Sequence, residues 1–94
     1  MSSRPNYSLT QLEYVLAIHK TGSFARAAEL CHVTQPTLSM QVQKLETELG
    51  GAIFDRSKKP LLLTDLGKKL IKQIQSLVRA ARVLHQMAAS CSGT

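Results

Sequence analysis

Three helix-start signals and their matching stop signals follow one another within the first fifty residues, and no other feature constrains this chain as much. Ser8 and Gln11 have the spacing of a capping box, and Gly22 is typical of the residue that ends such a helix. Ser23 can cap a second, short helix, and Thr34 can cap a third. The sequence therefore predicts three consecutive helices with very short connections.

Apolar residues recur at helical spacing in all three segments, which predicts the buried side of each helix. The residues expected to face the core are Leu9, Leu12, Val15, Leu16, Ile18 and His19 in the first helix, Phe24, Ala27, Ala28 and Leu30 in the second, and Leu38, Val42, Leu45 and Leu49 in the third. The second helix should stop near Cys31, and Pro36 lies in the first turn of the third, where its missing N–H is tolerated. Because the chain has two Phe, two Tyr and no Trp, aliphatic side chains must fill this core.

A basic turn between two short apolar runs follows the third helix, which should end at Gly50 and Gly51. Residues 53–56 and 61–63 have the character of short strands, and residues 57–60 form the turn between them. We expect a small hairpin that leans on the helices, since an isolated two-stranded hairpin is only marginally stable.

The last predicted helix is long. Thr64 can cap it with Asp65 in its first turn, and neither Pro nor Gly interrupts residues 68–92. Apolar residues recur along it at alternating spacings of four and three, which is typical of a coiled-coil seam. The predicted seam is Leu70, Ile74, Leu77, Ala81, Leu84 and Ala88, widened by Ile71 and Val78. Because a helix of this length extends beyond so small a core, we expect the seam to pair with a second copy in a homodimer.

The net charge of +6 is concentrated in one half of the chain. Residues 1–50 carry four basic and four acidic side chains, whereas residues 51–94 carry eight basic and two acidic ones. A surplus of this kind favours a polyanionic partner, although it also occurs in proteins that are merely soluble.

The second and third helices are joined by Cys31, His32 and Val33, and this tight link predicts a helix-turn-helix. A helix fits the major groove of DNA, and Gln35, Thr37, Ser39 and Gln43 could donate to or accept from base edges. An ordinary three-helix bundle with a solvated face fits the pattern about equally well.

Two long segments carry a family resemblance. From Leu12 the chain reads LEYVLAIHKTGSFARAAELCHVTQPTLSMQVQKLETELG, and from Ile53 it reads IFDRSKKPLLLTDLG. Over the stretch from Leu9 to Thr64 the sequence resembles the N-terminal domain of LysR-type transcriptional regulators. The resemblance implies a mainly α fold, a winged helix-turn-helix with a three-helix core and a short β-hairpin wing, followed by a long dimerisation helix.

The resemblance also implies how the chain is organised. We expect a DNA-binding domain over residues 1–64 and a linker and dimerisation helix over residues 65–94, with the family's effector-binding domain absent. The segments CHVTQPTLS, QKLE, FDRSK and VRAARVLHQMAAS are most similar to the peroxide-responsive, activating branch of the family. A family member that responds to a small metabolite, a nonspecific architectural DNA-binding protein and a helical protein-interaction module without DNA are the alternatives.

The expected partner is double-stranded DNA at a pseudo-palindromic promoter site, bound by an antiparallel pair of chains. The residues expected to contact DNA are Thr34, Gln35, Pro36, Thr37, Ser39, Met40, Gln43 and Lys44 in and before the third helix, and Arg56, Ser57, Lys58 and Lys59 in the wing. Many relatives have Arg where this chain has Met40, which can pack against a thymine methyl but cannot make a bidentate contact with guanine.

The sequence predicts neither an enzyme nor a metal or cofactor site. His19, His32 and His85 are scattered, and no catalytic set or phosphate-binding glycine loop is present. Cys31 is expected to be a small core residue and Cys91 a tail thiol, since two cysteines make no disulfide framework. Because no secretion signal or membrane span is apparent, we expect a soluble, cytoplasmic protein.

Overall fold

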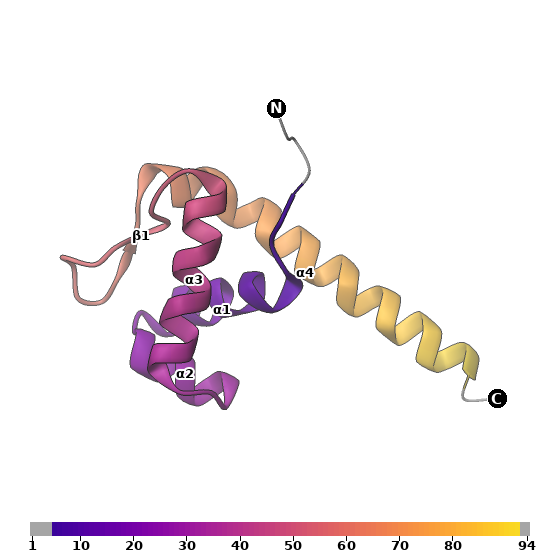
Figure 1. Cartoon of the computed structure of the whole chain (residues 1–94). Coiled ribbons are helices and arrows are strands. Elements are labelled where there is room, and N and C mark those ends of the chain that lie inside the picture. Colours follow the sequence, from indigo (N-terminus) through magenta and orange to yellow (C-terminus); the bar gives the residue numbers. More distant parts are fainter. Residues whose placement is uncertain (1–4, 93–94) are drawn as a thin grey trace.

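Three helices form the first half of the fold, in the order that the sequence predicts. In the computed structural model, which describes residues 5–92, these are α1 (Leu9–Thr21), α2 (Phe24–Cys31) and α3 (Gln35–Leu49). α1 packs against both α2 and α3, and α3 crosses in front of α1 in the view of Figure 1. The predicted helical half of the domain is therefore confirmed.

Local hydrogen bonds explain where these helices begin and end. The Ser8 hydroxyl accepts from the Gln11 N–H at 3.2 Å, and the Gln11 side-chain oxygen accepts from the Ser8 N–H at 2.9 Å, so the predicted capping box is present. The hydroxyls of Ser23 and Thr34 cap α2 and α3 by accepting from the N–H groups of Arg26 and Thr37. Gly22 ends α1 at a φ of 71°, a left-handed conformation in which glycine is not strained.

The connection between α2 and α3 is a turn of three residues. His32 adopts a left-handed φ of 59°, and its N–H donates to the carbonyls of Ala28 and Glu29. The Val33 N–H donates to the same Ala28 carbonyl at 3.0 Å. These bonds satisfy the last carbonyls of α2 and direct the chain into α3, as a helix-turn-helix requires.

The core differs in part from the predicted one. Val15 and Ile18 are completely buried at its centre, but Leu9 is 43% exposed, because it lies about 180° from Ile18 on the helical wheel. Leu30 is 49% exposed, since the short α2 meets its neighbours through the side that carries its alanines. His19 is exposed and lines an open hollow beside the wing instead of facing the core.

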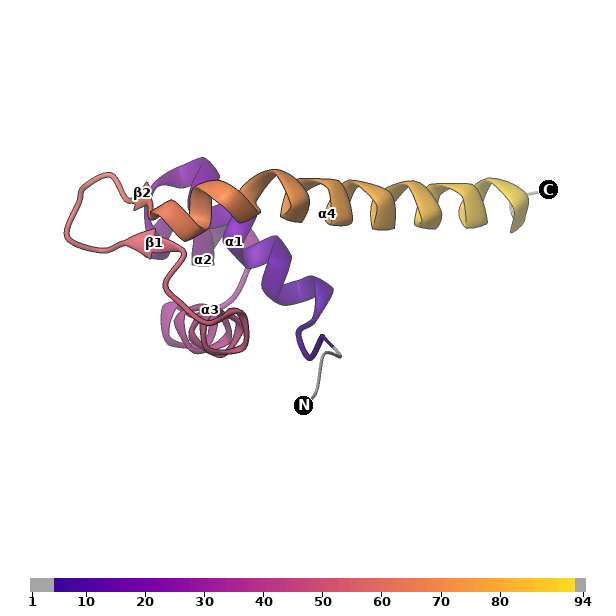
Figure 2. The same ribbon diagram turned by 90° about the horizontal axis from the view of Figure 1, so that it is seen from above.

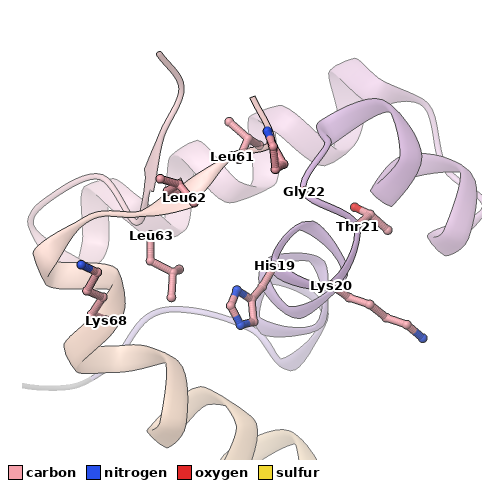
Figure 3. A pocket seen from close by; sticks show the side chains of 9 residues that line it. His19, Lys20, Thr21, Gly22, Leu61, Leu62, Leu63 and Lys68 are labelled. Atoms are coloured by element: carbon pink, nitrogen blue, oxygen red, sulfur yellow. The ribbon is translucent and has the colours of Figure 1, made fainter. Parts of the chain in front are cut away.

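The wing is a two-stranded antiparallel hairpin, shorter than predicted. β1 (Phe54–Asp55) pairs with β2 (Leu62–Leu63) in the register Phe54↔Leu63. The Leu61 N–H donates to the Gly22 carbonyl at 3.1 Å, and Figure 3 shows these two residues side by side. A Cβ at Gly22 would lie 2.8 Å from the Cβ of Pro60. The wing can therefore pack this closely against the turn after α1 because residue 22 has no side chain.

α4 (Asp65–Ser92) completes the domain and then leaves it. Thr64 lies at its start as predicted, and its hydroxyl oxygen accepts from the Gly67 N–H at 3.1 Å. Ile71, Ile74 and Val78 are buried in the common core, so the prediction that Ile74 faces a second chain is wrong.

Beyond Val78 the helix extends well past the other elements, as Figure 2 shows, which gives the molecule dimensions of 50 × 37 × 21 Å. No helix within residues 5–92 is long and apolar enough to cross a membrane.

Close packing at Gly67 generates a testable prediction about stability. A Cβ added there would lie 2.3 Å from the Ile53 carbonyl oxygen, a backbone atom that cannot turn aside. We expect Gly67→Ala to lower the free energy of unfolding by about 1–3 kcal/mol, the usual cost of overpacking. Urea unfolding followed by circular dichroism measures this loss.

Gly51→Ala is the matched control for Gly67→Ala. The nearest atom to a Cβ at Gly51 is the flexible end of the Leu66 side chain, at 3.0 Å. We expect its unfolding free energy to stay within about 0.5 kcal/mol of the unaltered chain. Equal losses for the two variants would contradict the steric explanation.

Candidate nucleic-acid interface

One side of α3 is buried and the other is open. Leu38, Val42 and Leu45 face the core, as predicted. Most of the predicted contact residues of α3 lie on the open side. Gln35, Pro36, Thr37, Met40, Gln43 and Lys44 are exposed, and Ser39 is half-buried. Because the first turn contains no acidic residue, this face has nothing to repel an anion at its N-terminal end.

Thr34 organises the start of α3. Its hydroxyl oxygen accepts from the Thr37 N–H at 3.3 Å, and the same hydroxyl donates to the Thr37 side-chain oxygen at 2.8 Å. The predicted helix cap at Thr34 is thus confirmed, and its contact with DNA stays a prediction. The backbone N–H groups of a first helical turn have no helical acceptor, so this end of α3 suits a negatively charged group.

The wing tip presents two lysines on a turn that Asp55 organises. The N–H and the hydroxyl of Ser57 donate to Asp55 Oδ1 at 3.0 and 2.5 Å. These two hydrogen bonds, with a smaller contribution from the charge of Lys58, hold the pKa of Asp55 below its usual value. Ser57 therefore stabilises the turn from within, while Lys58 and Lys59 are exposed at the tip.

Arg56 lies at the root of the wing and folds back onto the helices. Its guanidinium carbon is 4.4 Å from the centre of the Phe24 ring, within the range of a cation–π contact. Its Nη2 atom is 3.7 Å from Oε1 of Glu46. Phe24 also makes an edge-to-face contact with Phe54 of β1, with the ring centres 6.4 Å apart. The Arg56 side chain nevertheless remains 51% exposed.

A groove brings the helical and wing residues together. Gln35 and Ser39 line it from α3, Gly22, Ser23, Phe24 and Ala25 line it from α2 and the turn before it, and Arg56, Lys58, Lys59 and Leu61 line it from the wing. Five of the residues predicted to contact DNA thus line one concave surface, and three of these five are positively charged. Met40, Gln43 and Lys44 do not line the groove and extend the open face along α3.

The contribution of α2 to this groove was not predicted from the sequence. Phe24 follows a helix cap in an apolar segment, and that position predicts only a core residue. No local signal pairs it with an arginine that lies far along the chain, so its place beside Arg56 emerges only from the fold.

Neither cysteine lies in the groove. Burial raises the pKa of Cys31 and the nearby charge of Glu13 raises it further, so this thiol stays protonated near neutral pH. Cys91 is exposed in the last turn of α4. No group of three or more metal-ligating side chains occurs among the residues that the structure describes.

The distal part of α4 carries a second open surface, which is apolar. Leu77, Val83, Leu84 and Met87 are exposed large side chains, and Leu84 is 69% exposed. Of the other residues in the predicted seam, Ala88 is exposed, whereas Leu70 and Ala81 are half-buried. The open apolar surface therefore begins near Leu77, about two turns later than predicted.

Comparison with known proteins identifies similar sequences and folds. Residues 9–68 match the family described as bacterial regulatory helix-turn-helix protein, lysR family. The DNA-binding transcriptional dual regulator OxyR of Escherichia coli is 42% identical over 81 residues, which cover 86% of this chain and 27% of that protein. The chain thus spans about a quarter of that relative's length.

Two solved structures share the fold over nearly the whole chain. A full-length OxyR variant of Pseudomonas aeruginosa is 42% identical with a TM-score of 0.84, covering 90% of this chain and 29% of that one. Vibrio fischeri DarR, solved in complex with DNA, is 33% identical with a TM-score of 0.86, covering 94% of this chain and 30% of that one.

The turn at the wing tip generates a prediction about pH. Because the pKa of Asp55 is lowered by Ser57, the stabilisation of the turn should be complete above the ordinary carboxyl pKa and should disappear as the pH falls through the lower, folded value. Ser57→Ala should move the titration midpoint of Asp55 upward, as NMR of the carboxyl carbon would measure. Ser39→Ala, on another element, should leave the midpoint unchanged, and an unmoved midpoint in Ser57→Ala would contradict the assigned cause.

Proposed function

Because this chain belongs to the LysR family of bacterial helix-turn-helix regulators, we propose that it binds double-stranded DNA sequence-specifically through α3 and the wing. The single observation that carries the proposal is the groove in which the polar start of α3 meets the cations of the wing. A duplex offers the matching pair of surfaces, since base edges lie within a groove bordered by phosphates.

The two sides of the interface have different tasks in this proposal. α3 enters the major groove, where Gln35, Thr37, Ser39 and Gln43 exchange hydrogen bonds with base edges and Met40 packs against a thymine methyl. Pro36 packs beside them in the first turn, and the N-terminal end of α3 and Lys44 meet phosphates. Lys58 and Lys59 follow the flanking backbone or enter a narrow minor groove.

The likeness to OxyR supports a narrower assignment. The sequence is 42% identical to the OxyR regulator of Escherichia coli and, to the same extent, to a hydrogen peroxide-inducible genes activator of Pectobacterium carotovorum, so we assign the chain to an OxyR-like, redox-responsive activator. It supplies the DNA-binding part of such a regulator, which works in the cytoplasm. Cys31 is an unsuitable redox sensor because its raised pKa keeps the thiol protonated.

The wing lysines provide the experiment that tests DNA binding. Each phosphate that a protein neutralises adds about 0.9 to the steepness of log K against log salt, so Lys58→Ala combined with Lys59→Ala should lower the slope by about one to two units. Fluorescence anisotropy with a labelled duplex over a series of salt concentrations measures the slope.

Lys69→Ala combined with Lys72→Ala is the matched control, because it removes the same charge from exposed positions on α4. Its slope should stay close to that of the unaltered chain. An unchanged slope in the wing variant would remove the wing from the interface. If the folded, unaltered chain retains no duplex at all, a helical protein-interaction module becomes the better assignment.

We also propose that two chains pair through the distal part of α4, in an antiparallel arrangement. Leu77, Ala81, Leu84 and Ala88 keep the spacing of a coiled-coil seam beyond the point where the domain covers the helix. Val83 and Met87 add exposed apolar surface next to Leu84. In this arrangement the DNA-binding domain extends to about Val78, and the residues after it form the dimerisation arm.

Leu84 provides the test of pairing, because a charge there cannot disturb the core of a single chain. Leu84→Asp should convert the dimer to monomers in sedimentation equilibrium, since it would place a carboxylate in an apolar seam. Gln86→Asp introduces the same charge on the opposite side of α4 and should leave the dimer intact. A dimer that persists in Leu84→Asp would place the contact elsewhere.

A further inference from the structure

Glu46 directs the chain from α3 into the wing through both its backbone and its side chain. Its carbonyl accepts from the N–H groups of Gly50 and Gly51 at 2.9 and 3.0 Å, which ends the helix. Its Oε2 atom accepts from the Ile53 N–H at 2.8 Å, at the residue before β1. One residue of α3 thus sets the path of the chain as far as the first strand.

The second carboxylate oxygen of Glu46 faces Arg56. The ion pair at 3.7 Å and the stacking of the guanidinium on Phe24 approach Arg56 from two elements of the helical core. The same arginine lines the groove between α3 and the wing. Its charged end is therefore held in one place before any ligand arrives, although half of its side chain is open to solvent.

Glu46 itself is a poor candidate for contact with DNA. Its side chain is only 12% exposed, and a carboxylate repels phosphate. A contribution to binding must therefore pass through Arg56 and the wing. Holding a long side chain in its bound orientation reduces the conformational entropy cost of association.

We propose that Glu46 is a positioning residue for DNA recognition, which sets the wing against α3 and holds the Arg56 guanidinium against Phe24 so that it faces the groove. This inference rests on the proposed function, because it names the residue that prearranges the same interface. It assigns the C-terminal end of α3 a role in specificity, although the residues proposed to meet base edges all precede Glu46.

Glu46→Gln tests the role of the charge. The amide oxygen can still accept from the Ile53 N–H, while the ion pair with Arg56 is removed. The measured quantity is the ratio of the dissociation constants for random duplex and for a duplex enriched by the unaltered chain from a randomised pool. We expect this ratio to fall roughly three- to tenfold, the effect of one side chain that is no longer held. Affinity for random duplex should not weaken, because a negative charge has been removed.

Glu48→Gln is the matched control, since it makes the same change at an exposed position of α3 and should leave the ratio unchanged. Arg56→Lys keeps the charge and the Glu46–Ile53 bond but lacks the planar guanidinium, so it should lower the ratio in the same way. This variant also tests the proposal if Glu46→Gln unfolds. In an Arg56→Ala background, Glu46→Gln should have no further effect on the ratio.

Several results would overturn the inference. One is an unchanged ratio of dissociation constants in folded Glu46→Gln or in Arg56→Lys. Another is an equal loss of affinity for the random and the enriched duplex in Glu46→Gln. A third is an effect of Glu46→Gln in the Arg56→Ala background that is as large as in the unaltered chain. In each of these cases the unaltered chain still prefers its enriched duplex, so the proposed function survives. Failure of the unaltered chain to prefer any duplex would overturn both.

Discussion

The backbone of Ile53 is the point on which the arrangement of α3, the wing and α4 depends. Its N–H donates to the Glu46 carboxylate, and its carbonyl accepts from the N–H of Thr64 at 2.9 Å and from the Thr64 hydroxyl at 3.2 Å. Its side chain is completely buried. The same carbonyl would lie 2.3 Å from a Cβ at Gly67, so the first turn of α4 packs this closely because residue 67 has no side chain. Three elements are thus joined through Ile53, whose two backbone polar groups are both paired, as a buried backbone requires.

This junction explains how a small domain can present two surfaces that belong to different chain segments. α3 is held by its apolar side, so its polar side is open along its length. The wing is held at one side by Gly22 and at its root by the contacts of Arg56, which leaves its lysines at the tip. A groove whose two walls are held by these contacts suits recognition of a duplex, because less ordering of the protein is needed on binding.

α4 serves two purposes, and Val78 marks the change between them. Up to that residue its apolar side chains fill the domain core, where they contribute to stability in a single chain. Beyond it the large apolar side chains Val83, Leu84 and Met87 are exposed, and the helix continues past the other elements (Figure 2). An apolar stripe of this kind is unfavourable in water, which is the physical reason to infer a partner helix.

Sequence reasoning predicted the elements well and the contacts between them only in part. The hairpin was predicted longer than it is, because two apolar residues beside the strands do not pair in it. The side chain of Ile53 fills the core, and Leu61 joins the wing to the turn after α1. Ile74 was assigned to a dimer seam, because heptad spacing does not distinguish a partner helix from the chain's own core. Arg56 was predicted only as a DNA-contact residue of the wing, and its stacking on Phe24 of α2 was not predicted.

The sequence by itself determined where each helix begins and ends, since caps such as Ser8, Ser23 and Thr34 act through hydrogen bonds to residues three positions away. It also determined which side of α3 is polar, because helical periodicity is a local property. Only the tertiary structure decided that α2 lines the groove, that Glu46 meets Arg56 and that Ile74 is internal. Those outcomes depend on contacts between residues far apart in the chain, and such contacts exist only once the helices have packed.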